Sequence, residues 1–301
     1  MLKVRDDMQR ELVLGRPPRR VVSLVPSDTY TVACLAGVER LVGRTIYCEE
    51  PRGRIEGVPT VGGTKDASVE AILALEPDLV IANQEENTRP LLEALARQRI
   101  PVFVVFPKRV DEGVALVARL ARILGVEREP AARELVRACH AALAEATQLR
   151  SELTPLRAFC PIWADPLMTI HGETYISDAL DLAGALNVFA DRTRRYPLAA
   201  DLGVAKPLSV EKIVGRDVRY PRVTLEEVIA RAPEVVLLPD EPHPFTEEEA
   251  IAFRALPIPA SKPHGAHADR VVRLPGKDLC WYGAWSAQGI GRLRATVQRL
   301  M

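Results

Sequence analysis

The sequence predicts an α/β protein of two doubly wound lobes, joined by one long α-helix. Short apolar runs alternate with helical patterns in both halves of the chain, as expected for parallel sheets. The helix–strand pattern of residues 58–87 recurs in residues 223–239 at an offset of 156 residues. A long amphipathic pattern lies between these two copies. We therefore expect an N-terminal lobe at 19–127, a connecting helix at 128–153 and a C-terminal lobe at 154–301.

Residues 1–18 read as an N-terminal arm that leads into the first lobe. Pro26 is expected to end the first strand, with Ser27 or Asp28 capping the helix that follows. Gly37, Pro77 and Gly125 mark the ends of helices. The predicted strands are 20–26, 41–43, 78–82 and 102–106, and the predicted helices are 27–36, 69–76, 89–98 and 114–124.

The connecting helix begins at Pro130, a residue that suits a first helical position. Its length of about 24 residues corresponds to roughly 36 Å at 1.5 Å per residue. The second lobe repeats the alternation of the first, and residues 192–222 form a long polar connection within it. The predicted strands are 158–163, 187–189 and 271–274, and the predicted helices are 175–182, 247–256 and one from 287, beside the helix and strand of the second repeat copy.

Composition and charge narrow the class of protein. Forty basic and forty acidic residues cancel, so the overall charge does not indicate a nucleic-acid partner. No apolar run approaches the roughly 20 residues that span a bilayer, so we expect no membrane insertion. The polar start MLKVRDD has no signal-peptide pattern, which predicts a cytoplasmic protein as written and a periplasmic one if a signal was removed.

The motifs of common enzymes are absent from the sequence. There is no GxSxG elbow, and Gly289-Ile290-Gly291 lacks the third glycine of a dinucleotide fingerprint. His264 and His267 have the spacing to share a metal, but a solvated loop is the favoured interpretation because no third ligand is near. We therefore predict a non-enzymatic protein with no resident metal and no covalent cofactor.

Aromatic side chains are few, yet several follow predicted strands. These candidate ligand-binding residues are Tyr47, Trp163, Tyr220, Trp281, Tyr282 and Trp285. Ligands of doubly wound sheets bind beyond the carboxyl ends of the strands. Trp163 and Trp285 could each instead belong to a lobe core, but the set as a whole favours an aromatic-lined cleft.

The most specific motifs are RVVSLVPS, EPDLVIAN and the Tyr220-Pro221 pair ahead of Glu226. With these motifs the chain resembles the substrate-binding proteins of cobalamin and iron-chelate ABC importers, most closely the cobalamin-binding branch. The resemblance implies two lobes on one helical backbone with the ligand between them. It also implies that Glu70 and Glu226, one in each repeat helix, dock onto arginines of the membrane permease. A glutamate that complements the helix dipole is the alternative for each.

In the same family, aromatic residues line the cobalamin cleft. Tyr47 with Pro51 fits one family position, whereas Val61 and Asn83 stand where the cobalamin binder has tryptophans. We therefore expect a monomer that captures a cobalamin-like corrinoid or a ferric chelate in the interlobe cleft for an ABC importer. A cytoplasmic enzyme or corrinoid-handling protein on the same scaffold is the alternative function, and a receptor for a bare metal ion is a third.

Overall fold

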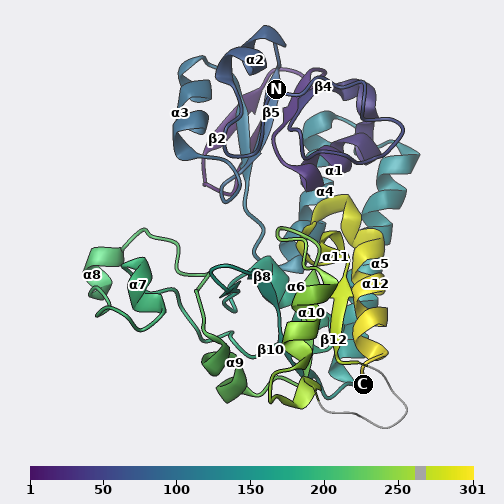
Figure 1. Ribbon diagram of the computed structural model, residues 1–301. Helices are drawn as coiled ribbons and strands as arrows, with labels where there is room; N and C mark the ends of the chain where they lie inside the picture. The colour runs from purple at the N-terminus through teal and green to yellow at the C-terminus, as the bar shows by residue number, and fades with distance from the viewer. Residues whose placement is uncertain (262–268) are drawn as a thin grey trace. The chain divides into compact units, whose positions relative to one another are not determined.

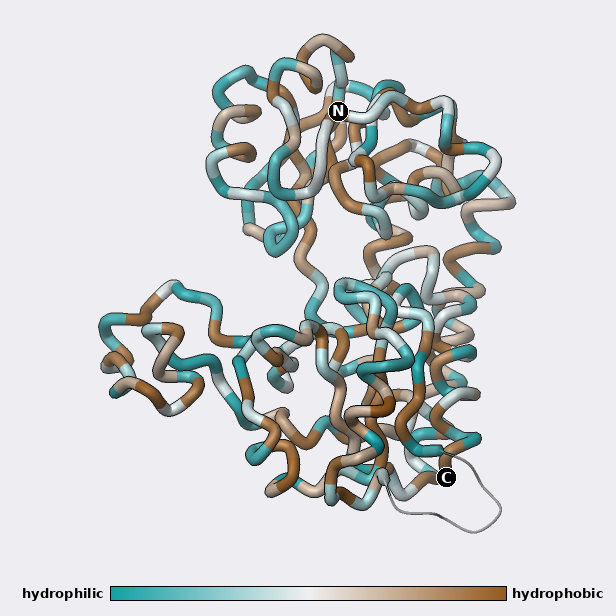
Figure 2. Tube along the Cα trace, viewed as in Figure 1, coloured by the Kyte–Doolittle hydropathy of each residue, from teal (hydrophilic) through white to brown (hydrophobic). Residues whose placement is uncertain are grey.

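The computed structural model describes residues 1–261 and 269–301 (Figure 1). The chain divides into two compact units, residues 1–143 with 281–287 and residues 144–280 with 288–301. Each unit has its own parallel sheet and its own apolar core. Most strand residues of both sheets are buried, as expected for doubly wound sheets that helices cover on both faces, and Figure 2 shows hydrophobic stretches in both units. The predicted fold class is confirmed.

Unit 1 contains a four-stranded sheet in the order β4-β3-β5-β6, with every pair parallel. Its strands are β3 (Val21–Ser23), β4 (Leu41–Arg44), β5 (Leu79–Asn83) and β6 (Val102–Val105). Its helices are α1 (Pro26–Ala36), η1 (Val38–Arg40), α2 (Val69–Ala74), α3 (Arg89–Arg97) and α4 (Val110–Leu124). Because the chain runs from β3 to β4 and then to β5 on the other side of β3, the switch point of this sheet lies between β3 and β5.

Pro26 begins a helix instead of ending a strand, which corrects the prediction. It occupies the first turn of α1, where a missing backbone N–H costs nothing, and Val25 is the N-cap. Ser27 and Asp28, predicted as caps, therefore lie inside the helix, and both are buried. This places the Asp28 carboxyl in the interior of unit 1.

The N-terminal segment of residues 1–18 is more ordered than predicted, because it forms an antiparallel hairpin of β1 (Leu2–Arg5) and β2 (Glu11–Leu14). Asp7 fastens the hairpin to β6. Its backbone N–H donates to the Val104 carbonyl at 2.9 Å, and its carboxylate accepts from the Phe106 N–H at 2.6 Å. The hairpin is thus part of unit 1.

The long helix α5 (Pro130–Ser151) has 22 residues and was predicted from its pattern. At 1.5 Å per residue it is about 33 Å long. The division between the units falls inside it, after Leu143. The chain returns from unit 2 to unit 1 near the C-terminus, because residues 281–287, which include η3 (Gly283–Trp285), belong to unit 1.

Unit 2 has a parallel sheet in the order β10-β7-β11-β12 and a separate hairpin of β8 and β9. Its strands are β7 (Leu156–Phe159), β8 (Pro161–Trp163), β9 (Met168–Thr169), β10 (Ala185–Asn187), β11 (Val235–Pro239) and β12 (Val271–Leu274). Its helices are α6 (Tyr175–Ala183), α7 (Leu198–Asp201), α8 (Val210–Ile213), α9 (Leu225–Arg231), α10 (Glu247–Arg254), η2 (Pro259–Ser261), α11 (Gly276–Cys280) and most of α12 (Ser286–Gln298).

The predicted repeat is confirmed at the level of individual elements. β5 and β11 occupy the same place in their sheets, and both their first and last residues differ by the offset of 156. α2 and α9 also begin 156 residues apart. Their N-caps act alike, since Ser68 accepts from the Ala71 N–H and Thr224 accepts from the Glu227 N–H.

One strand predicted for unit 2 needs correction. The strand predicted at 187–189 lies earlier, because the Asn187 carboxamide accepts from the Phe189 N–H at 2.9 Å and turns the chain. The long connection 192–222 contains the two short helices α7 and α8.

Candidate functional site

Tyr47 lies beyond the carboxyl end of β4 in unit 1, and 59% of its surface is exposed. The Gly62-Gly63 turn supports it. Gly62 has φ +109 and its carbonyl accepts from the Ile46 N–H at 2.9 Å. A Cβ at Gly63 would come within 3.2 Å of the Tyr47 ring and within 2.5 Å of an Asp66 oxygen. Glycine at 63 therefore lets the turn pack directly against the Tyr47 ring.

Trp163 and Tyr220 belong to one local structure in unit 2. Trp163 is at the end of β8, and 44% of its surface is exposed. Its register partner on β9 is Met168, which also bridges to Arg222. The Pro221 carbonyl accepts from the Thr169 N–H at 3.0 Å, so the segment of Tyr220 lies along the other edge of β9. The structure thus brings both aromatic residues to the hairpin that extends β7 at its carboxyl end.

His243 was not singled out by the sequence, because it stands alone in a loop after β11. Its ring lies 5.5 Å from the Trp163 ring. Its Nε2 is 2.8 Å from a carboxylate oxygen of Glu249, which orients the imidazole. A carboxylate-oriented imidazole beside an exposed indole is a candidate donor to the metal of a chelate.

Three predicted ligand residues near the C-terminus lie within unit 1. Trp281 packs against Tyr30 and Trp285 with ring centroids 6.3 Å and 5.2 Å away, and only 6% of its surface is exposed. Tyr282 is equally buried, and Trp285 lies 5.1 Å from the Tyr30 ring. Little of Trp281 and Tyr282 is available to a ligand, and their predicted binding role stays a prediction.

A polar cluster lies buried at the switch point of unit 1, between β3 and β5. The Tyr282 hydroxyl donates to Asp28 at 3.0 Å and accepts from the Asn83 Nδ2 at 2.9 Å. Burial raises the pKa of Asp28 to about 8, and burial beside Asp28 raises the pKa of Tyr282 well above its ordinary value. Among the residues that the structure describes, the buried Oδ1 of Asp28 has no hydrogen-bond partner.

Asn83 also shapes the turn that follows β5. Its Oδ1 accepts from the N–H groups of Glu85 and Glu86, at 2.7 and 3.1 Å. Asn87 closes the same turn by accepting from the Asn83 N–H and donating to the Thr64 carbonyl at 2.8 Å. Asn83 therefore has a structural role in the turn of residues 83–87.

Glu70 and Glu226 are exposed in the first turns of α2 and α9, the equivalent helices of the two units. Hydrogen bonds from its own backbone N–H and from the Thr224 side chain hold the pKa of Glu226 below its ordinary value. Each carboxylate is thus available on the surface at the same place in its repeat. Their docking role stays a prediction.

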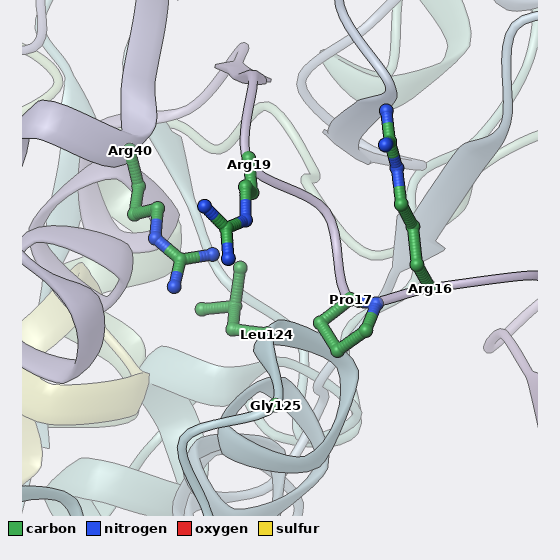
Figure 3. A pocket seen from close by; sticks show the side chains of 6 residues that line it. All are labelled: Arg16, Pro17, Arg19, Arg40, Leu124 and Gly125. Atoms are coloured by element: carbon green, nitrogen blue, oxygen red, sulfur yellow. The ribbon is translucent and has the colours of Figure 1, made fainter.

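A pocket of about 400 Å³ lies in unit 1 and is lined by Arg16, Pro17, Arg19, Arg40, Leu124 and Gly125 (Figure 3). Arg19 precedes β3 and Arg40 precedes β4, so the pocket is at the amino ends of the strands, away from Tyr47. The guanidinium groups of Arg19 and Arg40 point toward each other above Leu124. The C-terminal end of α4 favours such cations, and no predicted ligand residue lines this pocket.

Within residues 1–261 and 269–301, no group of three or more histidine, cysteine, aspartate or glutamate residues could hold a metal ion. His264 and His267 lie outside the described residues. His171 accepts the Glu173 N–H on its Nδ1 at 3.0 Å, as expected for a histidine satisfied within its loop. In the same described part of the chain, no helix combines the length and apolar character that a membrane span requires.

The chain has two α/β units, each with a parallel sheet, and one long helix that contributes to both. Aromatic residues are exposed past the strand ends. These features are typical of a ligand-binding protein of the two-domain type. The sequence model described as periplasmic binding protein matches residues 21–248, and the chain belongs to that family. A vitamin B12-binding protein of Yersinia pestis (strain Pestoides F) is 30% identical over 223 residues, which cover 73% of this chain and 69% of the relative. The family is one of binding proteins, so the enzyme alternative is not favoured.

Solved structures show the same fold. The periplasmic vitamin B12 binding protein of Vibrio cholerae aligns with a TM-score of 0.73 and 20% identity, covering 94% of this chain and 98% of its own. A periplasmic heme-binding protein from Roseiflexus sp. RS-1 aligns with a TM-score of 0.71 and 20% identity, covering 94% and 99%. A Helicobacter pylori protein with Ni(II) bound reaches a TM-score of 0.76 at 15% identity, covering 99% and 89%.

Proposed function

We propose that this protein captures a large metal chelate, a cobalamin-like corrinoid or a ferric chelate such as haem, in the periplasm and delivers it to an ABC importer. Membership of the periplasmic binding protein family supports a capture role. The relative named vitamin B12-binding protein supports the corrinoid class, and the heme-binding structural neighbours support the wider class of metal macrocycles.

The exposed aromatic residues past the strand ends carry the proposal. Tyr47 and Trp163 are exposed, and covering them with a ligand would stabilise the complex by about 25 cal/mol for each Å² of apolar surface removed from water. Both lie past the carboxyl ends of parallel strands, which is where doubly wound sheets bind ligands. A flat macrocycle covers such rings by stacking, a contact worth about 0.5–1.5 kcal/mol beyond the buried area. Tyr220, in the segment that runs along the other edge of β9, supplies a further aromatic ring at this hairpin of unit 2.

Delivery requires contact with a permease, and we assign that contact to Glu70 and Glu226. They are exposed carboxylates at equivalent positions of the two units, and the sequence repeat places them there. Guanidinium groups pair well with carboxylates in a two-pronged geometry, so arginines on the permease are the matching partners. This assignment leaves ligand capture independent of both glutamates.

Titration with cyanocobalamin and with haem, followed by the corrin and Soret absorbance, tests the proposal. We expect saturable binding of at least one of them, weakened roughly tenfold by Tyr47→Ala or Trp163→Ala. Ile251→Ala removes an exposed aliphatic side chain from α10 and is the control that should bind normally. If neither chelate binds at a concentration of about 10 μM, the proposed ligand class is wrong.

A further inference from the structure

The connection between β10 and α9 carries a feature that ligand capture does not use. Residues 194–217, here called the arm, lead away from the sheet of unit 2, form the two short helices α7 and α8, and return to it. Figure 1 shows α7 and α8 standing away from the strands of their unit, and Figure 2 shows hydrophobic segments along the same stretch.

Aliphatic side chains of the arm face solvent. Val204, Val210 and Val214 are 79%, 73% and 78% exposed. Three leucines of the arm are exposed as well, namely Leu198, Leu202 and Leu208. Apolar residues exposed singly are normal on a protein surface, but such a concentration within one short stretch marks an interaction surface.

The exposure is not a consequence of a loose loop, because the base of the arm is firmly held. Arg192 is 5% exposed and pairs with the fully buried Asp201 at 3.1 Å and with Glu227 at 2.8 Å. The Tyr196 hydroxyl donates to the Asp217 carbonyl at 2.8 Å, and the Arg194 N–H donates to the Val218 carbonyl at 2.7 Å. The protein thus maintains a buried ion network that presents apolar side chains to water.

The charge of this connection is strongly one-sided. Residues 192–222 contain eight basic and three acidic residues, whereas the whole chain is neutral. The exposed cations of the arm are Arg195, Lys206, Lys212 and Arg216. Of its two exposed acidic residues, Glu211 and Asp217, the second is paired with Arg219 at 2.6 Å. The exposed aliphatic surface is therefore bordered by an excess of positive charge.

We propose that the arm binds the surface of a membrane that contains anionic phospholipids. The valines and leucines enter the headgroup boundary, and the lysines and arginines lie at the lipid phosphates. A protein partner fits less well, because protein interfaces favour aromatic residues and disfavour lysine, and leucine and valine are rare among their main energetic contributors. A lipid surface accepts aliphatic side chains in any arrangement. The contact is peripheral and is separate from the capture of a chelate.

Co-sedimentation of the purified full chain with vesicles tests this inference. Vesicles of equal parts phosphatidylglycerol and phosphatidylcholine should bind the protein, and vesicles of phosphatidylcholine alone should bind it far less. Lys206→Glu with Lys212→Glu should weaken binding at least tenfold, since each basic residue contributes about fivefold near an anionic surface. Val204→Asp with Val214→Asp should abolish binding, and added salt should weaken the binding of the wild type.

Ile251→Asp is the control matched to the single variant Val204→Asp, because it places the same charge at a 58% exposed aliphatic position on α10. It should sediment like the wild type. Equal binding to both vesicle types, absence of binding to either, or equal losses in the Ile251 and valine variants would each overturn the inference. A dimer that dissociates on Val204→Asp with Val214→Asp, without vesicle binding, would identify the arm as a self-association surface and also overturn it.

Discussion

The Tyr282 hydroxyl donates a 3.0 Å hydrogen bond to Asp28, a residue 254 positions earlier in the chain. This bond ties a segment near the C-terminus to the first helix of unit 1. Asp28 itself lies in an interior where its charged form is poorly solvated, and this burial raises the pKa of Asp28 to about 8. At neutral pH the folded protein therefore holds a proton that the unfolded chain releases.

The stability of the protein should consequently fall as the pH rises across the interval from about 4 to about 8. In this interval the native state binds more protons at Asp28 than the unfolded state, so the slope of the unfolding free energy is negative, at most about 1.4 kcal/mol per pH unit from one group. Asp28→Asn has no proton to lose and should flatten this dependence, becoming the more stable protein near pH 8. Urea unfolding at a series of pH values measures the effect.

Asp111→Asn is the control for that experiment, because Asp111 is half exposed and its ion pair with Arg109 lies at the surface. Its pH profile should run parallel to that of the wild type. Parallel profiles for the wild type and Asp28→Asn would show that Asp28 titrates normally.

The Asp28 cluster also shows where sequence reasoning stops. The repeat could be recognised in the sequence because the segments that contain Glu70 and Glu226 have the same pattern of apolar residues. Such local patterns indicate helices and strands. The return of residues 281–287 to unit 1 had no such signal, since a long-range hydrogen bond leaves no periodic trace. For the same reason the sequence did not indicate that Tyr282 is buried and bonded to Asp28. Its predicted ligand role stays a prediction.

Pro26 and the arm illustrate two further limits. A proline can end a strand or begin a helix. The structure shows that Pro26 begins α1, because Asp28 lies buried inside that helix. Residues 192–222 read as a polar connection because α7 and α8 have only four residues each, too few for an apolar period, and the Arg192–Asp201 ion pair leaves no periodic pattern. Exposed candidates such as Tyr47 were found because their position after a strand is a local property.

The aromatic residues should separate into two groups when they are truncated. Trp281→Ala removes a buried ring packed between Tyr30 and Trp285 and should cost about 3–5 kcal/mol of unfolding free energy. Tyr47→Ala and Trp163→Ala should leave the urea midpoint nearly unchanged and weaken the chelate. A Trp281→Ala protein of normal stability that no longer binds the chelate would instead assign Trp281 to the ligand.

Permease docking should depend on both equivalent glutamates. Glu70→Ala combined with Glu226→Ala should bind the chelate normally and fail to support uptake in cells that depend on this protein and its importer. The reason is that exposed first-turn carboxylates can contact a partner without touching the core. Glu248→Ala, at an exposed first-turn position of α10, is the control and should support uptake. Normal uptake by the double variant would contradict the assignment.

The ion network at the base of the arm should be one of the most costly polar sites of unit 2 to disrupt. Arg192→Ala leaves Asp201 fully buried without its partner, and breaking a buried pair in this way typically costs about 3–5 kcal/mol. Arg89→Ala removes an arginine whose pair with Glu93 lies in solvent, and no measurable change is expected because water screens such pairs. Urea unfolding followed by circular dichroism compares the two variants.

Limited proteolysis then locates the damage, because loss of the Arg192 contacts should expose the arm to cleavage while the sheet of unit 2 stays protected. If Arg192→Ala were as stable as Arg89→Ala, the buried pair would not be what holds the arm in place.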